Sequence, residues 1–413
     1  MTPRRLKHVA TLVAGQSPPS EVVAPLIDGR PFLQGNAEFG LVHPQAKYEA
    51  DLAPKRSVQG DLLISVRAPV GALNLANREY GIGRGLCAVR ARSIDRRFLW
   101  WWAHTQVTAL NAVATGSTYA AVSASDVGNL PVPDIPLDEQ RRIADFLDSE
   151  TARLDSLMAR RAVQTSLLGE RRASLLFELL GRVDGGPAAR SGLPWLPTVP
   201  SHWSVVKLTL LARLGSGHTP SRSRPEWWVD ATIPWITTGE VAQLRDDRVE
   251  ELTETREMIS QVGIANSAAE LHPRGTVVLS RTASVGYSAV MGADMATSQD
   301  FATWTCGPRL DPYYLLWTLR AMRPWLLGAR AMGSTHKTIY MPDIQALRLP
   351  LPPLAEQRAI VDRIRTELSA LDAVRDVLDD QVELLRERRQ ALITAAVTGQ
   401  LDVTTAQRAT VSS

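Results

Sequence analysis

Few residues of this 413-residue chain have the types and spacing that chemistry requires. The stretch DPYY (311–314) is close to an Asp-Pro-Pro-Tyr loop that could hold an amino group for methylation, and GIGRG (81–85) could turn around a dinucleotide. DPYY, however, aligns with DRRF (95–98), so Asp311 is better interpreted as the N-cap of a helix. GIGRG lacks a following helix with an acidic residue about 20 positions on. Neither stretch predicts an active site.

Metal, nucleophile and membrane signals are also absent from the sequence. Cys87 and Cys306 lie far apart, and no Cys/His cluster has the spacing of a zinc site. There is no P-loop, H-E-x-x-H or G-x-S-x-G, and no stretch approaches the roughly 18 apolar residues of a membrane span. The N-terminal apolar run is too short for a secretory signal. With 45% hydrophobic residues, we expect a reduced cytoplasmic protein of two to four folding units without a catalytic or metal site.

The strongest signal is an internal repeat. At an offset of 217 residues, LDEQRRIADFLDSETARLD (137–155) aligns with LAEQRAIVDRIRTELSALD (354–372). The alignment continues over LLGERR and LLRERR, over two GST triplets at 116–118 and 333–335, and over Asp126 and Asp343. At nearby offsets, GDLLISVRAPVG matches GTVVLSRTASVG, and GQSPPS matches GHTPSR. The chain is therefore a tandem duplication of a unit of about 200 residues, too long for a solenoid repeat.

Each half consists of a domain followed by a helix. Short apolar runs bounded by Gly and Pro predict strands in mixed α/β domains, and the Pro-rich LPVPDIP and LRLPLPP predict an extended hinge before each helix. The regions predicted in chain order are a first domain (1–135), a first helical region (136–182), a Gly- and Pro-rich linker (183–203), a second domain (204–352), a second helical region (353–400) and a tail (401–413).

The two helices carry apolar stripes with heptad spacing, which favours pairing with each other. The alternative is two unrelated amphipathic helices, each lying on its own domain. The predicted pairing positions, which include matched polar residues, are Ile143, Leu147, Glu150, Leu154, Leu157, Leu168 and Arg171 in the first helix, and Ile360, Ile364, Glu367, Leu371, Val374, Leu378, Leu385 and Arg388 in the second.

The stretches PLDEQRRIADFLD and PLPPLAEQRAIVDRI, each behind a GST-bearing domain and a Pro-rich hinge, resemble the specificity subunit of type I restriction-modification systems. The resemblance covers nearly the whole chain. It implies an α+β fold, with two mixed α/β target recognition domains and two conserved helices that pair as an antiparallel coiled coil about a pseudo-twofold axis. It also implies that each domain reads half of a split site in double-stranded DNA.

The same resemblance implies that this chain is a subunit without catalysis or cofactor. S-adenosylmethionine, ATP and magnesium then belong to partners, expected as two methyltransferase (modification) subunits and two restriction subunits. Helices of about 40 residues span ~60 Å, enough to separate half-sites by a ~34 Å turn of DNA. Because the two domains differ outside the framework, we expect an asymmetric, interrupted target.

In an antiparallel pair about a pseudo-twofold axis, the numbers of facing residues add up to a constant. Placing Glu150 opposite Arg388 and Glu367 opposite Arg171 gives 538 for both and predicts two ion pairs at the edge of the seam. The alternative is that the two glutamates cap or contact their own domains.

The candidates for DNA contact are basic and hydroxyl residues on loops that recur in both halves. Such side chains bind phosphates, whereas base edges are read by Arg at guanine and by Asn or Gln at adenine. The candidates are Ser17, Lys55, Arg56, Arg67, Arg84, His218, Ser221, Arg222, Arg224, Arg281, His336 and Lys337. For each, a solvated surface group is the competing interpretation. The GST triplets fit a turn better than a base contact, and the eleven tryptophans fit domain cores better than base stacking.

Two other classes of function remain open from the sequence. A self-sufficient nucleic-acid enzyme would need a cofactor loop or a metal-ligand set. A coiled-coil scaffold whose domains bind protein would not need two divergent domains in one repeated frame. The net charge of +3 is compatible with any of the three.

Overall fold

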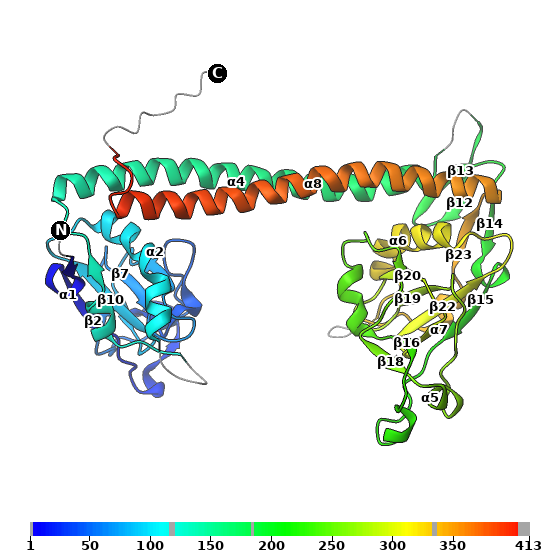
Figure 1. Ribbon diagram of the computed structural model, residues 1–413, viewed down its shortest axis with the longest axis horizontal. Helices are drawn as coiled ribbons and strands as arrows, with labels where there is room; N and C mark the ends of the chain where they lie inside the picture. The colour runs from blue at the N-terminus through cyan, green and yellow to red at the C-terminus, as the bar shows by residue number, and fades with distance from the viewer. Residues whose placement is uncertain (1–2, 115–119, 183–185, 333–336, 404–413) are drawn as a thin grey trace. The chain divides into compact units, whose positions relative to one another are not determined.

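The computed structural model describes residues 3–114, 120–182, 186–332 and 337–403 (Figure 1). It divides into two compact units: unit 1 is Met1–Val163 with Asp379–Ser413, and unit 2 is Gln164–Leu378. Both boundaries fall inside the long helices α4 (Leu137–Leu180) and α8 (Leu354–Val397). Each unit therefore consists of one mixed α/β domain and one part of each helix.

The domain of unit 1 is built on two small sheets. The first has the order β2 (Ala10–Ala14), β10 (Leu86–Ala91), β7 (Leu62–Ser65) and β8 (Leu73–Leu75), all antiparallel. The second has the order β3 (Ala24–Pro25), β5 (Tyr48–Glu49), β4 (Pro31–Leu33), β9 (Tyr80–Ile82) and β6 (Arg56–Ser57). Further elements are β1 (Arg4–Arg5), which pairs with β11 (Pro131–Val132), and the short helices α1 (Leu6–Val9) and α3 (Ala124–Gly128).

Helix α2 (Arg96–Val113) supplies most of the aromatic core of unit 1. Its N-cap is Asp95, whose side chain accepts hydrogen bonds from the backbone of Arg97 and Phe98. Trp101 and Trp102 of the WWW run are buried, and the Trp102 indole donates to the carbonyl of Pro131. These tryptophans are therefore core residues, because burial with a satisfied indole N–H is their most favourable use here.

The domain of unit 2 repeats this arrangement. The larger sheet has the order β15 (Ala212–Ser216), β22 (Phe301–Cys306), β19 (Val277–Ser280), β20 (Ser288–Met291) and β17 (Glu251–Leu252). The smaller sheet has the order β18 (Glu257–Ile259), β16 (Ile233–Ile236) and β21 (Ala296–Thr297). Two further pairs are β14 (Ser204–Lys207) with β23 (Arg348–Leu351) and β12 (Ala188–Leu193) with β13 (Leu196–Pro200).

The helices of unit 2 match those of unit 1. Helix α6 (Pro312–Ala329) begins at Asp311, whose side chain accepts from the backbone of Tyr313 and Tyr314, so the predicted N-cap is confirmed. The short helices α5 (Gln261–Ala265) and α7 (Met341–Gln345) complete the unit, and α7 stands at the position that corresponds to α3. The domain topology thus confirms that the chain is a duplication.

Residues 186–203, the described part of the predicted linker (183–203), are packed into unit 2. Strands β12 and β13 form a hairpin, and Trp195, Leu196 and Trp203 are buried in the same core as the end of α4. The apolar residues between the prolines supply this packing.

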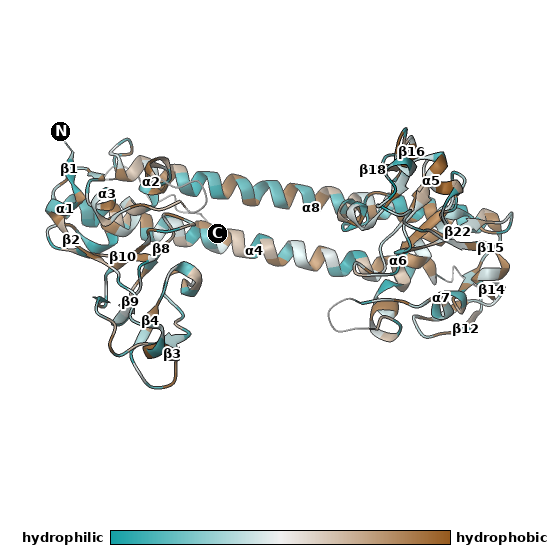
Figure 2. Ribbon diagram, turned by 90° about the horizontal axis from the view of Figure 1, so that it is seen from below, coloured by the Kyte–Doolittle hydropathy of each residue, from teal (hydrophilic) through white to brown (hydrophobic). Residues whose placement is uncertain are grey.

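The halves of α4 and α8 run antiparallel within each unit. In unit 1, Ile143 and Leu147 near the start of α4 share a core with Ile393 and Val397 near the end of α8. In unit 2, the end of α4 (175–180) shares a core with the start of α8, including Val361 and Ile364. Hydrophilic and hydrophobic residues are interspersed along both helices (Figure 2), which agrees with a narrow apolar seam at heptad spacing. The predicted α+β class with antiparallel long helices is confirmed.

The predicted register of the helix pair is wrong. Asp155 lies 2.9 Å from Arg389 in unit 1, and Asp372 lies 3.3 Å from Arg172 in unit 2, so the numbers of the paired residues add up to 544 instead of 538. The difference of six residues is an axial displacement of about 9 Å. The helices use the second arginine of each Arg-Arg pair, because Arg171 and Arg388 point to the exposed face and Arg171 pairs with Glu178 of its own helix.

The other predicted pairing residues differ in burial. Glu367 is exposed, Glu150 is half-buried and Val374 is 51% exposed, so these three do not lie at the centre of the seam. Buried positions are Ile143, Leu147, Leu154, Ile364 and Leu378, and half-buried positions are Leu157, Leu168, Ile360, Leu371 and Leu385. The apolar contact is therefore densest where each helix half also meets its domain.

Candidate nucleic-acid interface

In unit 1, three loops meet where β2 and β4 end and where β9 passes into β10. The backbone N–H of Gln16 donates to Ile82 at 2.9 Å, and that of Gly83 donates to Leu33 at 2.8 Å. We call residues 15–17, 34–35 and 83–85 the first loop junction. A side chain on Gly15 would place its Cβ 2.1 Å from the carbonyl oxygen of Gly83, so the crossing requires glycine there.

Polar side chains converge on the first loop junction. The hydroxyl of Ser17 accepts from Nε2 of Gln34 at 3.0 Å and from the backbone N–H of Arg84 at 3.2 Å. The side chains of Gln34 and Arg84 are exposed, whereas Ser17 is half-buried. Arg67 lies on the adjacent loop, since Val66 donates to the carbonyl of Gly85 at 2.9 Å. The junction thus brings together three predicted residues, Ser17, Arg67 and Arg84.

Unit 2 forms a second loop junction at the same place in its topology, from residues 217–219, 237–239 and 298–300. The backbone N–H of His218 donates to Thr297 at 3.0 Å, and that of Ser298 donates to Ile236 at 2.9 Å. A Cβ on Gly217 would lie 1.8 Å from the carbonyl oxygen of Thr297. The glycines of GQSPPS and GHTPSR therefore serve the same backbone crossing.

The second loop junction also joins a hydroxyl to a glutamine. Oγ1 of Thr219 donates to Oε1 of Gln299 at 2.7 Å, and the side chain of Gln299 is exposed. The predicted residues Arg281 and Lys337 lie beside it: Arg281 donates its N–H to Asp300, and Ala283 donates to the carbonyl of Lys337. His336 and the two GST triplets lie outside the described residues.

The remaining predicted DNA contacts are exposed, and several already have acidic partners. Arg56 on β6 lies 3.5 Å from Glu79, and the neighbouring Lys55 is exposed. Arg222 pairs with Glu257 and stacks 3.9 Å over the ring of Trp228. Arg224 lies 3.6 Å from Glu226, and the Ser221 hydroxyl bonds that of Ser223. These residues stay predictions; a phosphate would have to displace the carboxylates.

Sequence reasoning missed Gln34 and Gln299. Alignment of the two halves places Gln34 opposite Thr237 and Gln299 opposite Arg84, so no repeated glutamine marks either position. Only the loop crossings bring each glutamine to the repeated hydroxyl.

A buried glutamine ties each long helix to its domain. Gln140 of α4 accepts from the backbone N–H of Asp95 at 2.8 Å and donates to the carbonyl of Ile135 at 2.7 Å. Gln357 of α8 accepts from the N–H of Asp311 at 2.8 Å and donates to Arg309 and Pro352, each at 2.9 Å. The repeated glutamine of the Glu-Gln-Arg triplet is therefore explained by backbone groups that need a buried partner.

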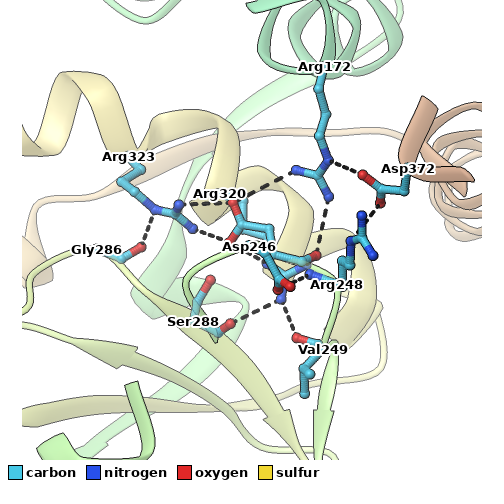
Figure 3. A network of polar contacts seen from close by, with 10 residues as sticks. Arg172, Asp246, Arg248, Val249, Gly286, Ser288, Arg320, Arg323 and Asp372 are labelled. Atoms are coloured by element: carbon cyan, nitrogen blue, oxygen red, sulfur yellow. Dashed lines mark hydrogen bonds and ion pairs between the residues drawn. The ribbon is translucent and has the colours of Figure 1, made fainter. Parts of the chain in front are cut away.

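Unit 2 adds an ionic network between its domain and the two long helices (Figure 3). Asp247 accepts from Arg323 at 2.9 Å and lies 3.5 Å from Nε of Arg320, whose side chain is fully buried. Burial lowers the pKa of Arg320 to about 10, although Asp247 opposes that shift. Arg172 of α4 lies 3.9 Å from Asp247 and 3.3 Å from Asp372 of α8. The network therefore connects the domain to both helices.

Residues 3–114, 120–182, 186–332 and 337–403 show neither a metal-binding cluster nor a membrane-spanning helix. Within these ranges, no group of His, Cys, Asp and Glu side chains is arranged to hold a metal ion. The helices of the same ranges include none with the length and apolarity that a membrane crossing requires.

The model of the type I restriction modification DNA specificity domain matches residues 5–163 and 200–377, and the chain belongs to this family. The chain is 35% identical to the putative type I restriction enzyme MjaX specificity subunit of Methanocaldococcus jannaschii over 135 residues. This aligned stretch covers 32% of this chain and 32% of that one. It is 21% identical over 368 residues to the EcoDI specificity subunit of Escherichia coli, covering 83% of this chain and 77% of that one. The alignment with the first relative thus spans about a third of that relative's length.

Two solved structures share the fold. A chain from a structure concerning assembly and conformational transition of the type I R-M system has a TM-score of 0.76 at 22% identity, covering 96% of this chain and 97% of that one. The HsdS subunit from Thermoanaerobacter tengcongensis has a TM-score of 0.52 at 21% identity, covering 96% of both chains.

Proposed function

We propose that this chain is the DNA-reading specificity subunit of a type I restriction-modification complex. Each domain reads one half of an asymmetric, interrupted site in double-stranded DNA. The observation that carries the proposal, beyond membership of the family, is that the two loop junctions share one backbone scaffold but carry different residues at aligned positions, Gln34 against Thr237 and Arg84 against Gln299. A shared scaffold with divergent exposed groups suits two different base sequences.

The long helices set the separation of the two half-sites and offer docking places to the modification subunits. Each helix has 44 residues, which at 1.5 Å per residue is about 66 Å. Half-sites one helical turn apart need roughly 34 Å, so this length suffices. Since the helices are duplicated, two modification subunits per chain are expected, and the family resemblance implies two restriction subunits as well.

In this proposal the chain directs chemistry without performing it. Methyl transfer, cleavage and the binding of S-adenosylmethionine, ATP and magnesium belong to the partner subunits. The purified chain, given all three, should neither methylate nor cut DNA, and the same assay with its modification subunit should restore methylation. Robust activity of a preparation free of partners would favour the self-sufficient enzyme.

A domain exchange tests the reading of half-sites. Residues 1–130 are replaced by the matching domain of a relative, and the host's methylated bases are sequenced. One half of the methylated motif should change while the other half stays. A change in both halves would contradict separate reading, and a wild-type chain that directs no methylation would favour the scaffold.

A further inference from the structure

Each loop junction holds one glutamine on a hydroxyl that the duplication preserves. Ser17 in GQSPPS and Thr219 in GHTPSR occupy the same aligned position, after the glycine that the backbone crossing requires. The glutamines come from different loops: Gln34 follows β4, whereas Gln299 lies between β21 and β22. The same pair of groups has thus been assembled twice from different parts of the repeat.

The hydroxyls orient the amides and leave most of their hydrogen-bonding groups free. Nε2 of Gln34 gives one N–H to Ser17, which leaves its second N–H and the carbonyl oxygen Oε1. Oε1 of Gln299 accepts from Thr219 and keeps a second lone pair, while both N–H groups remain available. Each exposed amide can therefore still donate one hydrogen bond and accept one side by side.

We propose that Gln34 and Gln299 are base-reading residues, each recognising the adenine of one A·T pair in its half-site. A glutamine reads adenine in the major groove by accepting from the N6 amino group and donating to N7. Holding the amide in place beforehand reduces the conformational entropy lost on binding. This inference rests on the proposed function, because it specifies how the same chain reads DNA.

The groups around each glutamine fit a phosphate backbone. The backbone N–H of Arg84 donates to the same Ser17 hydroxyl as Gln34, and Arg67 lies on the adjacent loop. The backbone around Gln299 adjoins His218 and Arg281, the latter through the hydrogen bond to Asp300. Arginines at these places set the position on the duplex while the amide reads the base. Since the glutamines project from different loops, the two adenines should stand at different places within their half-sites.

Selection from a randomised library of DNA duplexes tests the inference. The full chain, purified with the modification subunit of its native complex, selects duplexes as wild type, Gln34→Ala and Gln299→Ala. The exposed glutamines Gln45 and Gln261 lie outside the junctions and provide matched Ala controls in units 1 and 2. Each junction variant should lose roughly ten- to one-hundredfold of the preference for adenine at one position of one half-site.

A variant with a charged side chain should acquire a preference for a different base. Gln34→Glu replaces the amide with a carboxylate, which accepts from the N4 amino group of cytosine, so the preference at that position should move from adenine towards cytosine. Ser17→Ala should weaken the adenine preference by a smaller factor. In this variant Gln34 can still contact the base, but the hydroxyl that orients its amide is removed.

The outcomes separate the two proposals. A wild-type complex that enriches no motif refutes the proposed function, and the inference with it. A two-part motif that Gln34→Ala and Gln299→Ala leave unchanged, or one without adenine at the affected positions, overturns the inference alone. A uniform loss of affinity at all positions also overturns it, since that result marks a positioning role.

Discussion

The two units attach their domains to the helices in different ways. In unit 1, Arg97 of α2 lies 2.7 Å from Asp145 and 3.0 Å from Asp148 of α4, and all three side chains are at least 41% exposed. In unit 2, Asp247 and its arginine partners are at most 15% exposed. The buried glutamines Gln140 and Gln357, in contrast, are alike. Duplication has preserved the groups that satisfy buried backbone, whereas the charges around them have diverged.

The largest expected effect comes from the buried network of unit 2. Asp247→Asn leaves Arg320 and Arg323 without their carboxylate, and should lower the free energy of unfolding by about 3 kcal/mol. Asn tolerates the left-handed φ of 59° at this position, so the backbone is preserved. Chemical denaturation measures the change. The control Asp145→Asn in unit 1 should cost about 0–1 kcal/mol, since its ion pair is exposed; equal losses would contradict the comparison.

The helix-anchoring glutamines should have the next largest effect. Gln357→Met keeps the volume but leaves the N–H of Asp311 and the carbonyls of Arg309 and Pro352 without this partner. We expect a loss of about 2–3 kcal/mol, against about 1–2 kcal/mol for Gln140→Met, which releases fewer buried groups. Denaturant midpoints at constant m-value provide the measurement. A neutral result at both positions would mean that water satisfies these groups.

The interhelical ion pairs should contribute less. Arg172 and Asp372 are 14% and 17% exposed, while Arg389 and Asp155 are 25% and 50% exposed. Double-mutant cycles to Ala should therefore give a coupling energy of about 1 kcal/mol or more in unit 2, and about 0.5 kcal/mol in unit 1. Repeating both cycles at high salt should reduce only the exposed pair. A larger coupling in unit 1 would show that burial does not govern these pairs.

The smallest expected effect is a pH dependence that both units share. Burial lowers the pKa of His104 in unit 1 and of His272 in unit 2 below the ordinary value, with Arg389 adding to the shift of His104 and Glu270 opposing that of His272. The unfolded chain then takes up protons first, so stability is full above pH ~6.5 and is lost as the pH falls through that value.

Glutamine substitutions test this pH dependence. His104→Gln and His272→Gln should each flatten the slope of the unfolding free energy between pH 7.5 and 5. A steeper slope in either variant would have the wrong sign.

Much of the fold could be predicted from the sequence. These predictable features are the repeat, the long helices with their apolar stripes and the Asp311 N-cap. They depend on residue types and their spacing, which can be read directly from the sequence. The predicted DNA contacts at Ser17, Arg67 and Arg84 do lie together, because the loops that carry them are themselves repeated. Their contact with bases or phosphates stays a prediction.

The sequence by itself determined that two helices with matched arginines and acids would face one another, but not which arginine would lie in the seam. Arg171 and Arg172 differ by 100° around the helix, a choice that depends on the packing of both helices against the domains. The glutamines Gln34 and Gln299 likewise reach their hydroxyls only through loop crossings between distant segments. Local periodicity is set by neighbours in the chain, whereas facing partners are set by contacts that only the tertiary structure creates.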